Sequence, residues 1–160
     1  MANIKLEYGA ASQAITCTLA SLANGSAREC TAVDNGTNKF LDALLYLALK
    51  LATGTPASDK ALYVWFYSSE DGTNYSDNAT GSDAGVTLRS PNNFRGPFMI
   101  QTPDSGALTY KQVIPSVAAF FGGVLPPKWG FVIENKTGLA LDATEGNHTK
   151  EYRGVYATSA

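Results

Sequence analysis

Apolar and polar residues alternate along most of this 160-residue chain, which is the pattern of strands with one buried face. In residues 15–20, every second residue is Ile, Cys or Leu. The Asn24-Gly25 pair that follows is typical of a turn, so residues 28–33 are predicted to return as the neighbouring strand. The other predicted strands are residues 61–68, 86–89, 98–102, 108–114, 129–134, 139–142 and 148–158.

Residues 39–52 fit two secondary structures. Local propensity favours a helix with one apolar face, whereas the strand interpretation places six alternate apolar residues on one face. Because the segments on both sides are predicted strands, we interpret residues 39–52 as a long core strand. The helix face would hold Phe40, Leu44, Leu47 and Leu51, and the strand face Leu41, Ala43, Leu45, Leu47, Leu49 and Leu51.

The predicted strand at residues 61–68 is bulky on both faces, because Leu, Val and Phe alternate with Tyr and Trp. We expect the core to cover one face and a loop or a second subunit to cover the other. Residues 73–85 are polar and aperiodic, which predicts a long exposed loop. Residues 117–121 are predicted to form one helical turn, stopped by Gly122-Gly123.

Turn residues recur about every ten positions between these short strands, which is typical of an antiparallel β-sandwich or jelly roll. No internal repeat or linker divides the chain, so residues 1–160 are predicted to form a single all-β domain. Within it, residues 1–12 are predicted to be a flexible N-terminal arm that orders on binding.

Composition narrows the range of functions. Charged residues supply 16% of the chain, below the usual figure of about 25%. The formal net charge of −2 provides no basic field for nucleic acid or for an anionic membrane, so neither is expected as a partner.

The chain begins without the apolar core of a secretory signal, and no run approaches the roughly 20 apolar residues of a membrane span. We therefore expect the protein to be made and folded in a cytoplasm. In that compartment Cys17 and Cys30 are expected to be buried thiols rather than a disulfide.

The sequence contains few candidates for catalytic residues. His148 is the only imidazole, and its position in a Gly-Asn-His-Thr turn predicts a surface histidine rather than a general base. No nucleophile elbow, phosphate-binding loop or dinucleotide fingerprint is present. We expect no enzyme activity, no catalytic residue, no cofactor and no resident metal. Loop carboxylates could in principle bind calcium, although their spacing does not match an EF-hand: Glu70, Asp71, Asp77 and Asp83.

The string Ser69-Glu-Asp-Gly-Thr-Asn-Tyr75 predicts a structural hairpin. In it, Asp71 would accept backbone N–H groups, Gly72 would take a positive φ, and Tyr75 would pack back on the sheet. Six Asn-x-Ser/Thr triplets are interpreted as turn and loop residues rather than as glycan sites; they begin at Asn24, Asn35, Asn74, Asn78, Asn135 and Asn147.

Aromatic residues in the strands offer a second functional interpretation, a platform on which sugars stack. We favour burial in the core or in a subunit contact, because these residues lie in mid-strand positions. The residues concerned are Tyr63, Trp65, Tyr67, Trp129 and Tyr152.

Residues 120–138, Phe-Phe-Gly-Gly-Val-Leu-Pro-Pro-Lys-Trp-Gly-Phe-Val-Ile-Glu-Asn-Lys-Thr-Gly, resemble a segment of small β-sandwich structural proteins of tailed bacteriophages. Residues 40–44, the strand leading into residues 69–75, and the ending at residues 147–155 are similar to the same proteins. The resemblance covers most of the chain after residue 38 and transfers no functional residue, because such proteins act through surface complementarity.

The resemblance implies a virion protein, most like a capsid decoration or cement protein on the capsid surface, assembled in the host cytoplasm. Its implied partners are the major capsid protein and further copies of itself, with a homotrimer favoured. Binding through several copies would multiply weak contacts with the shell. The alternative is a glycan-binding module of a phage tail or fibre, and a hydrolase is a third, less favoured class.

Overall fold

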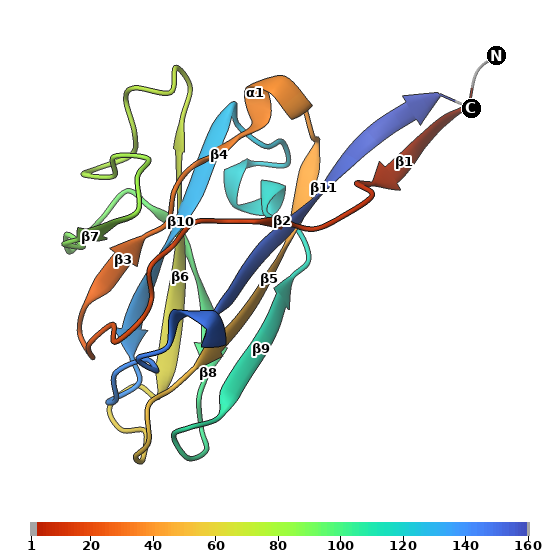
Figure 1. The fold of residues 1–160 in the computed structure, drawn as a ribbon. Coiled ribbons are helices and arrows are strands. Elements are labelled where there is room, and N and C mark those ends of the chain that lie inside the picture. The colour runs from red at the N-terminus through yellow and green to blue at the C-terminus, as the bar shows by residue number, and fades with distance from the viewer. Residues whose placement is uncertain (1–2, 160) are drawn as a thin grey trace.

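Two antiparallel sheets packed face to face make up this computed structural model, which describes residues 3–159 (Figure 1). The first sheet runs in the order β1 (Ile4–Tyr8), β11 (Thr149–Ser159), β5 (Asp42–Lys50) and β9 (Thr109–Ile114), and β2 (Gln13–Ala14) pairs with β11. The second runs β7 (Ala84–Val86), β3 (Ala27–Glu29), β10 (Lys128–Lys136), β6 (Ala61–Ser69) and β8 (Arg95–Gln101), and β4 (Val33–Asp34) pairs with β10. The predicted single-domain β-sandwich is confirmed.

Strand β5 confirms the strand interpretation of residues 39–52. Its inward residues Ala43, Leu45 and Leu47 are completely buried between the sheets. Burial of this face against the second sheet outweighs the helix propensity of the leucines, since propensity differences are only a few tenths of a kcal/mol per residue. The only α-helix among the described residues is the single turn α1 (Asn35–Asn38), which precedes this strand.

Strand β6 is covered on both faces, as its sequence predicts. Leu62, Val64 and Phe66 point into the main core. On the opposite face, Tyr67 belongs to a second apolar cluster with Phe94. A loop of this chain therefore covers the outer side of β6.

Residues 15–19 differ from the prediction. Their alternate side chains Ile15, Cys17 and Leu19 are buried, but the segment forms no strand after β2 and crosses from the first sheet to the second (Figure 1). Carboxylates take the place of a strand partner: Asp83 accepts the N–H of Thr18, and the Glu145 carboxylate accepts that of Leu19. Because the segment crosses between the two sheets, every second side chain enters the core even though its backbone pairs with no strand.

Several strands also have other bounds than the sequence predicts. The strand predicted at residues 28–33 is divided into β3 and β4, and the one at residues 86–89 lies earlier, at β7. Residues 139–142 form only a single bridge, between Leu51 and Leu141. The predicted helical turn is confirmed as the 3-10 helix η1 (Ala118–Phe121), and a second one, η2 (Glu145–Asn147), precedes β11.

Cys17 and Cys30 form a disulfide, so the expectation of buried thiols is wrong. The crossing segment runs beside the end of β3, where Thr31 donates its N–H to the carbonyl of Thr16 at 2.8 Å. This contact brings the two cysteine Cα atoms to 4.3 Å from each other. The compartment favours thiols, but the positions of the two cysteines on neighbouring predicted strands already allow them to lie close together, and this closeness decides the outcome.

The predicted N-terminal arm, residues 1–12, contains a strand. Residues 4–8 form β1, which pairs with the last residues of β11. Met1 and Ala2 lie outside the described residues.

Candidate functional site

The most exposed apolar surface lies on a two-stranded ribbon, formed by β1 and residues 155–159 of β11. The two strands pair from Ile4 with Ser159 to Tyr8 with Val155. Figure 1 shows this ribbon extending away from the two packed sheets, beyond the end of β5. It is therefore open to a partner on both faces.

One face of the ribbon is apolar. Ile4, Leu6 and Tyr8 are exposed by 79%, 67% and 62%, and they alternate with Lys5 and Glu7 on the other face. Since residues paired across antiparallel strands point to the same side, Val155 and Ala157 join the apolar set. We call these five residues the ribbon face: Ile4, Leu6, Tyr8, Val155 and Ala157.

The ribbon is fixed to the sandwich at its base. Gly9 donates its N–H to the carbonyl of Gly154 at 2.8 Å, and the ring of Phe40 packs over Gly154. Phe40 also lies 6.5 Å from Tyr152 and 6.3 Å from Tyr156, between ring centroids. This aromatic contact holds the direction in which the ribbon leaves the body.

The ribbon face continues onto the outer side of β5. Leu44 and Tyr46, both half-buried, and Val113 of β9, which is 46% exposed, line a shallow pocket of about 210 Å³. Arg153 and Glu151 lie at the same pocket. The outer side of the first sheet therefore offers an apolar surface with charged residues on β11.

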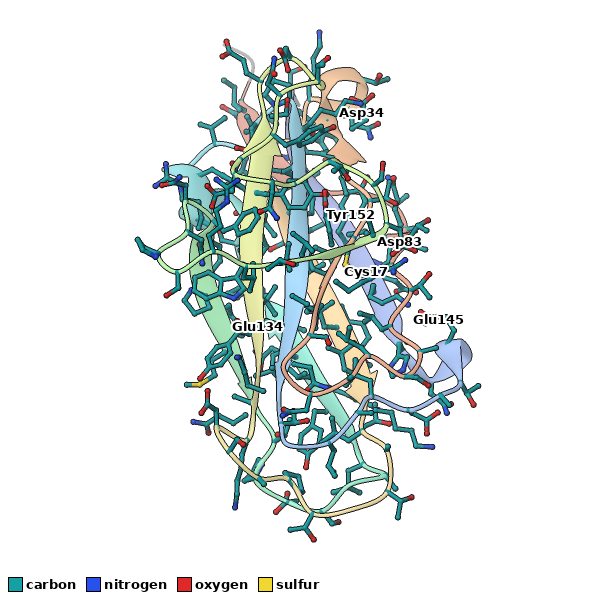
Figure 2. All side chains as sticks on the ribbon, turned by 90° about the vertical axis from the view of Figure 1, so that its left-hand side faces the viewer. Cys17, Asp34, Asp83, Glu134, Glu145 and Tyr152 are labelled. Carbon is teal, nitrogen blue, oxygen red and sulfur yellow. A yellow bond between two sulfur atoms is a disulfide. The ribbon has the colours of Figure 1, made fainter. Side chains whose placement is uncertain are left out.

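The second sheet carries a different feature on its outer side, which we call the Trp65 groove. It consists of two adjoining hollows of about 510 and 560 Å³ that share Leu88, Glu134 and Lys136. The half-buried Trp65 donates its indole N–H to the Glu134 carboxylate at 2.9 Å, and Lys136 lies 3.3 Å from that carboxylate. Figure 2 looks onto this side. It shows Glu134 beside strands β6 and β10, below the loop that runs across the outer side of the second sheet.

The covering loop, residues 70–94, is held through two carboxylates: that of the buried Glu29, which no sequence pattern indicated, and that of the half-buried Asp83, one of the candidate calcium residues. The carboxylate of Glu29, only 1% exposed, accepts the N–H groups of Thr80 at 2.8 Å and of Gly81 at 2.6 Å. Asp83 pairs with Arg28 at 2.6 Å. Burial raises the pKa of Asp83, but its hydrogen bonds from Arg28 and Thr18 outweigh this and leave the pKa below its ordinary value. These contacts make the loop part of the fold.

The candidate calcium residues do not come together. Asp71 accepts the N–H groups of Asn74 and Thr73, which hold the pKa of its carboxyl well below the usual range. Asp77 instead binds Asn93, and Asp83 binds Arg28 as described. Across residues 3–159, no group of three or more His, Cys, Asp or Glu side chains is placed to hold a metal ion.

The hairpin string behaves as predicted. Gly72 has a φ of +77°, and the carboxylate of Asp71 caps the turn. Tyr75 packs edge-on against Tyr67, with ring centroids 5.7 Å apart. The string thus closes the turn and anchors the start of the covering loop.

The five strand aromatics form no single platform. Trp129 and Tyr152 meet inside the main core, with ring centroids 5.5 Å apart, and Tyr67 is completely buried on the outer side of β6. Only Tyr63 and Trp65 are partly exposed. Burial is therefore confirmed for three of the five residues, and of the two partly exposed ones it is Trp65 that lines the hollows on the second sheet.

His148 is buried, so its interpretation as a surface turn histidine is wrong. Its Nδ1 accepts the N–H of Lys50 at 3.3 Å, and its Nε2 lies 3.0 Å from the carbonyl oxygen of Asp142. Both ring nitrogens thus bind the backbone, and the imidazole links β5 to the turn before β11. Two asparagines of the glycosylation triplets, Asn35 and Asn135, are also buried, which supports a structural role for them.

Neither family models, nor curated proteins, nor solved structures give a match to this chain. The likeness to tailed-phage sandwich proteins therefore stays a prediction from the residues quoted for it. Within the described part of the chain, no helix has the length and apolar character needed to cross a bilayer.

Proposed function

We propose that this chain is a non-enzymatic structural protein of a tailed-phage virion, a decoration or cement protein that binds the major capsid protein and stabilises the head shell. The fold and the resemblance in residues 120–138 agree on a small β-sandwich. The proposed site of shell contact is the ribbon face.

The exposed ribbon face is the observation that carries this proposal. Three large apolar side chains are mostly exposed to solvent, on a segment that contributes no residue to the main core: Ile4, Leu6 and Tyr8. Contiguous exposed apolar surface is rare on monomers and marks sites of protein contact. A ribbon held away from the body also presents its apolar face to a partner without any rearrangement of the sandwich.

The Cys17–Cys30 disulfide supports a protein that works outside a reducing compartment. Disulfides persist in oxidising surroundings, which a particle meets once it has left the host cell. The charged contacts that fix the covering loop, such as Glu29 with Thr80, likewise give a rigid body that loses little entropy on binding.

Particles of the parent phage that lack the chain provide the test. Added back, the wild-type protein should bind the shells and raise their resistance to heat and dilution. The double variant Leu6→Ser/Tyr8→Ser should lose this binding, because it removes the apolar contact. Met99→Ser on β8 is the matched control, since Met99 is also exposed, by 46%, on the other sheet. Shells that are equally stable with and without the chain would contradict the proposal.

The Trp65 groove favours one second candidate, a glycan-binding module. A partly exposed indole beside a carboxylate and a lysine combines the stacking surface and the hydrogen-bonding groups that sugars need. Titration with a panel of bacterial surface glycans tests it. Binding that is lost in Trp65→Ala and retained in Tyr63→Ala would favour this candidate over the capsid role.

A further inference from the structure

The free edge of β1 has a defined hydrogen-bonding pattern. Because Gly9 donates to the carbonyl of Gly154, and because the orientation alternates along an antiparallel strand, the N–H and C=O groups of Glu7 and Lys5 face β11. Those of Ile4, Leu6 and Tyr8 therefore point to the other side, where β1 is the last strand of its sheet. Within residues 3–159, three residues thus present main-chain groups without a partner along this edge.

Both edges of the second sheet are protected in ways that β1 is not. Strand β7 has only three residues, and β8 carries Pro97 and lies opposite an irregular register at Val64 and Phe66. Strand β9, the other edge of the first sheet, carries the exposed Lys111, as β1 carries Lys5. Short strands, proline, bulges and lysine are the usual devices against edge pairing. β1 is regular, contains no proline, and has an exposed apolar face.

The sequence of β1, Ile-Lys-Leu-Glu-Tyr, is complementary to itself. In an antiparallel pair centred on Leu6, Lys5 lies opposite Glu7 of the second copy, and Ile4 lies opposite Tyr8 of that copy. Sliding one β1 by two residues in either direction leaves only two of the three outward-facing pairs within residues 4–8. It also places Lys5 against Lys5, or Glu7 against Glu7. Opposite charges across a strand pair stabilise it and like charges destabilise it.

We propose that β1 pairs antiparallel with β1 of a second copy of this chain, about a two-fold axis at Leu6. The pair would form about six main-chain hydrogen bonds, two for each of the three outward-facing residue pairs. Lys5 and Glu7 of each copy would form ion pairs on one side. The other side would bring both ribbon faces together into one apolar surface.

The ribbon geometry allows this contact. Because β1 and the end of β11 extend beyond the packed sheets (Figure 1), the free edge of β1 lies to the side of the sandwich, where a second ribbon can approach it. The contact is isologous and closes on itself, so it joins chains in pairs and does not propagate into fibres. It does not depend on the proposed capsid role, because the purified chain alone is sufficient to form it.

Charge reversal tests the register on the full chain. Sedimentation velocity should show a concentration-dependent dimerisation that Glu7→Lys weakens about tenfold, because two ion pairs become like-charge pairs. The double variant Lys5→Glu/Glu7→Lys should restore wild-type affinity. Far-UV circular dichroism should stay unchanged and the thermal transition should move little, since both side chains are exposed and Glu7 loses only its exposed hydrogen bond from the Tyr156 hydroxyl. A wild-type chain that sediments as a monomer up to about 1 mM overturns the proposal, as does association that ignores both variants.

Cross-linking tests the axis itself. Leu6→Cys should form a disulfide between copies under mild oxidation, because paired Cα atoms at a hydrogen-bonded position lie about 5.5 Å apart. Ile4→Cys is the control and should not cross-link, since its counterpart lies about four residues away along the strand, roughly 13 Å. Efficient cross-linking through Ile4→Cys instead would overturn the register. Capsid binding is measured separately on particles, so failure of either proposal is distinguishable from failure of the other.

Discussion

The ring of Phe40 packs directly on the backbone of Gly154, so closely that a Cβ atom at residue 154 would overlap the ring. This contact lies where β11 leaves the sandwich and enters the ribbon. It requires glycine because of the close approach, and no flexible side chain end can move aside, since Phe40 is also held by Tyr152 and Tyr156.

Gly154→Ala is therefore expected to lower the free energy of unfolding by about 1–3 kcal/mol through overpacking. Urea denaturation measures this change. Gly146→Ala is the control, because no atom lies within 4 Å of a Cβ at that position, and it should change stability by less than about 0.5 kcal/mol. Equal effects of the two variants would mean that Phe40 does not occupy this position in solution.

Glu29→Gln is expected to loosen the loop that covers the second sheet. The Glu29 carboxylate is buried and accepts the N–H groups of Thr80 and Gly81, and hydrogen bonds to a charged group contribute about 1.5–3 kcal/mol. Amide exchange at Thr80 and Gly81 should accelerate, and the unfolding midpoint should fall. Glu70→Gln, at the exposed first residue of the covering loop, should leave both unchanged.

The alternating pattern predicts most of the sandwich, because one buried face dominates the choice of structure in a strand such as β5. It predicts less where backbone groups bind side chains from distant positions. Residues 15–19 alternate like a strand, yet the N–H groups of Thr18 and Leu19 bind carboxylates that lie 65 and 126 positions further along the chain. No local pattern marks such a partner.

The same distinction applies to the candidate site: features held by local contacts are predictable from the sequence, and features held by distant contacts are not. Alternation of Ile4, Leu6 and Tyr8 was present in the sequence and could have indicated a strand, but its pairing with residues 155–159 links the two ends of the chain. Likewise, burial of His148 depends on contacts with Lys50 and Asp142 that no turn signal reveals. The hairpin at Asp71 was predictable, because all its hydrogen bonds are local.

Loss of the Cys17–Cys30 disulfide is expected to lower the free energy of unfolding by about 3 kcal/mol, since the bond closes a loop of 13 positions. The double variant Cys17→Ser/Cys30→Ser should show this loss, and reductant should lower the stability of the wild type but not of the variant. A thiol count on the denatured, unreduced protein should find no free cysteine; two free thiols would contradict the bond.

Acid should destabilise the protein partly through Asp142. The carboxylate accepts hydrogen bonds from the Asn147 side chain at 2.8 Å and from the Thr144 N–H at 2.9 Å, and Lys50 lies 3.4 Å away. These contacts lower the pKa of Asp142 from 3.8 to about 2. Because the pKa in the folded state is depressed, the stabilisation is complete above the unfolded pKa near 3.8 and is lost as the pH falls towards 2.

Asp142→Asn separates this contribution from those of the other acids. The amide oxygen can still accept both hydrogen bonds, but the side chain no longer titrates or attracts Lys50. The difference in melting temperature between wild type and variant should therefore be largest at pH 7 and should shrink between pH 4 and pH 2, where wild-type Asp142 becomes protonated. Asp104→Asn, in an exposed loop, provides the control for removal of a negative charge. A difference that stays constant from pH 7 to pH 2 would show that Asp142 stabilises the turn through its shape alone.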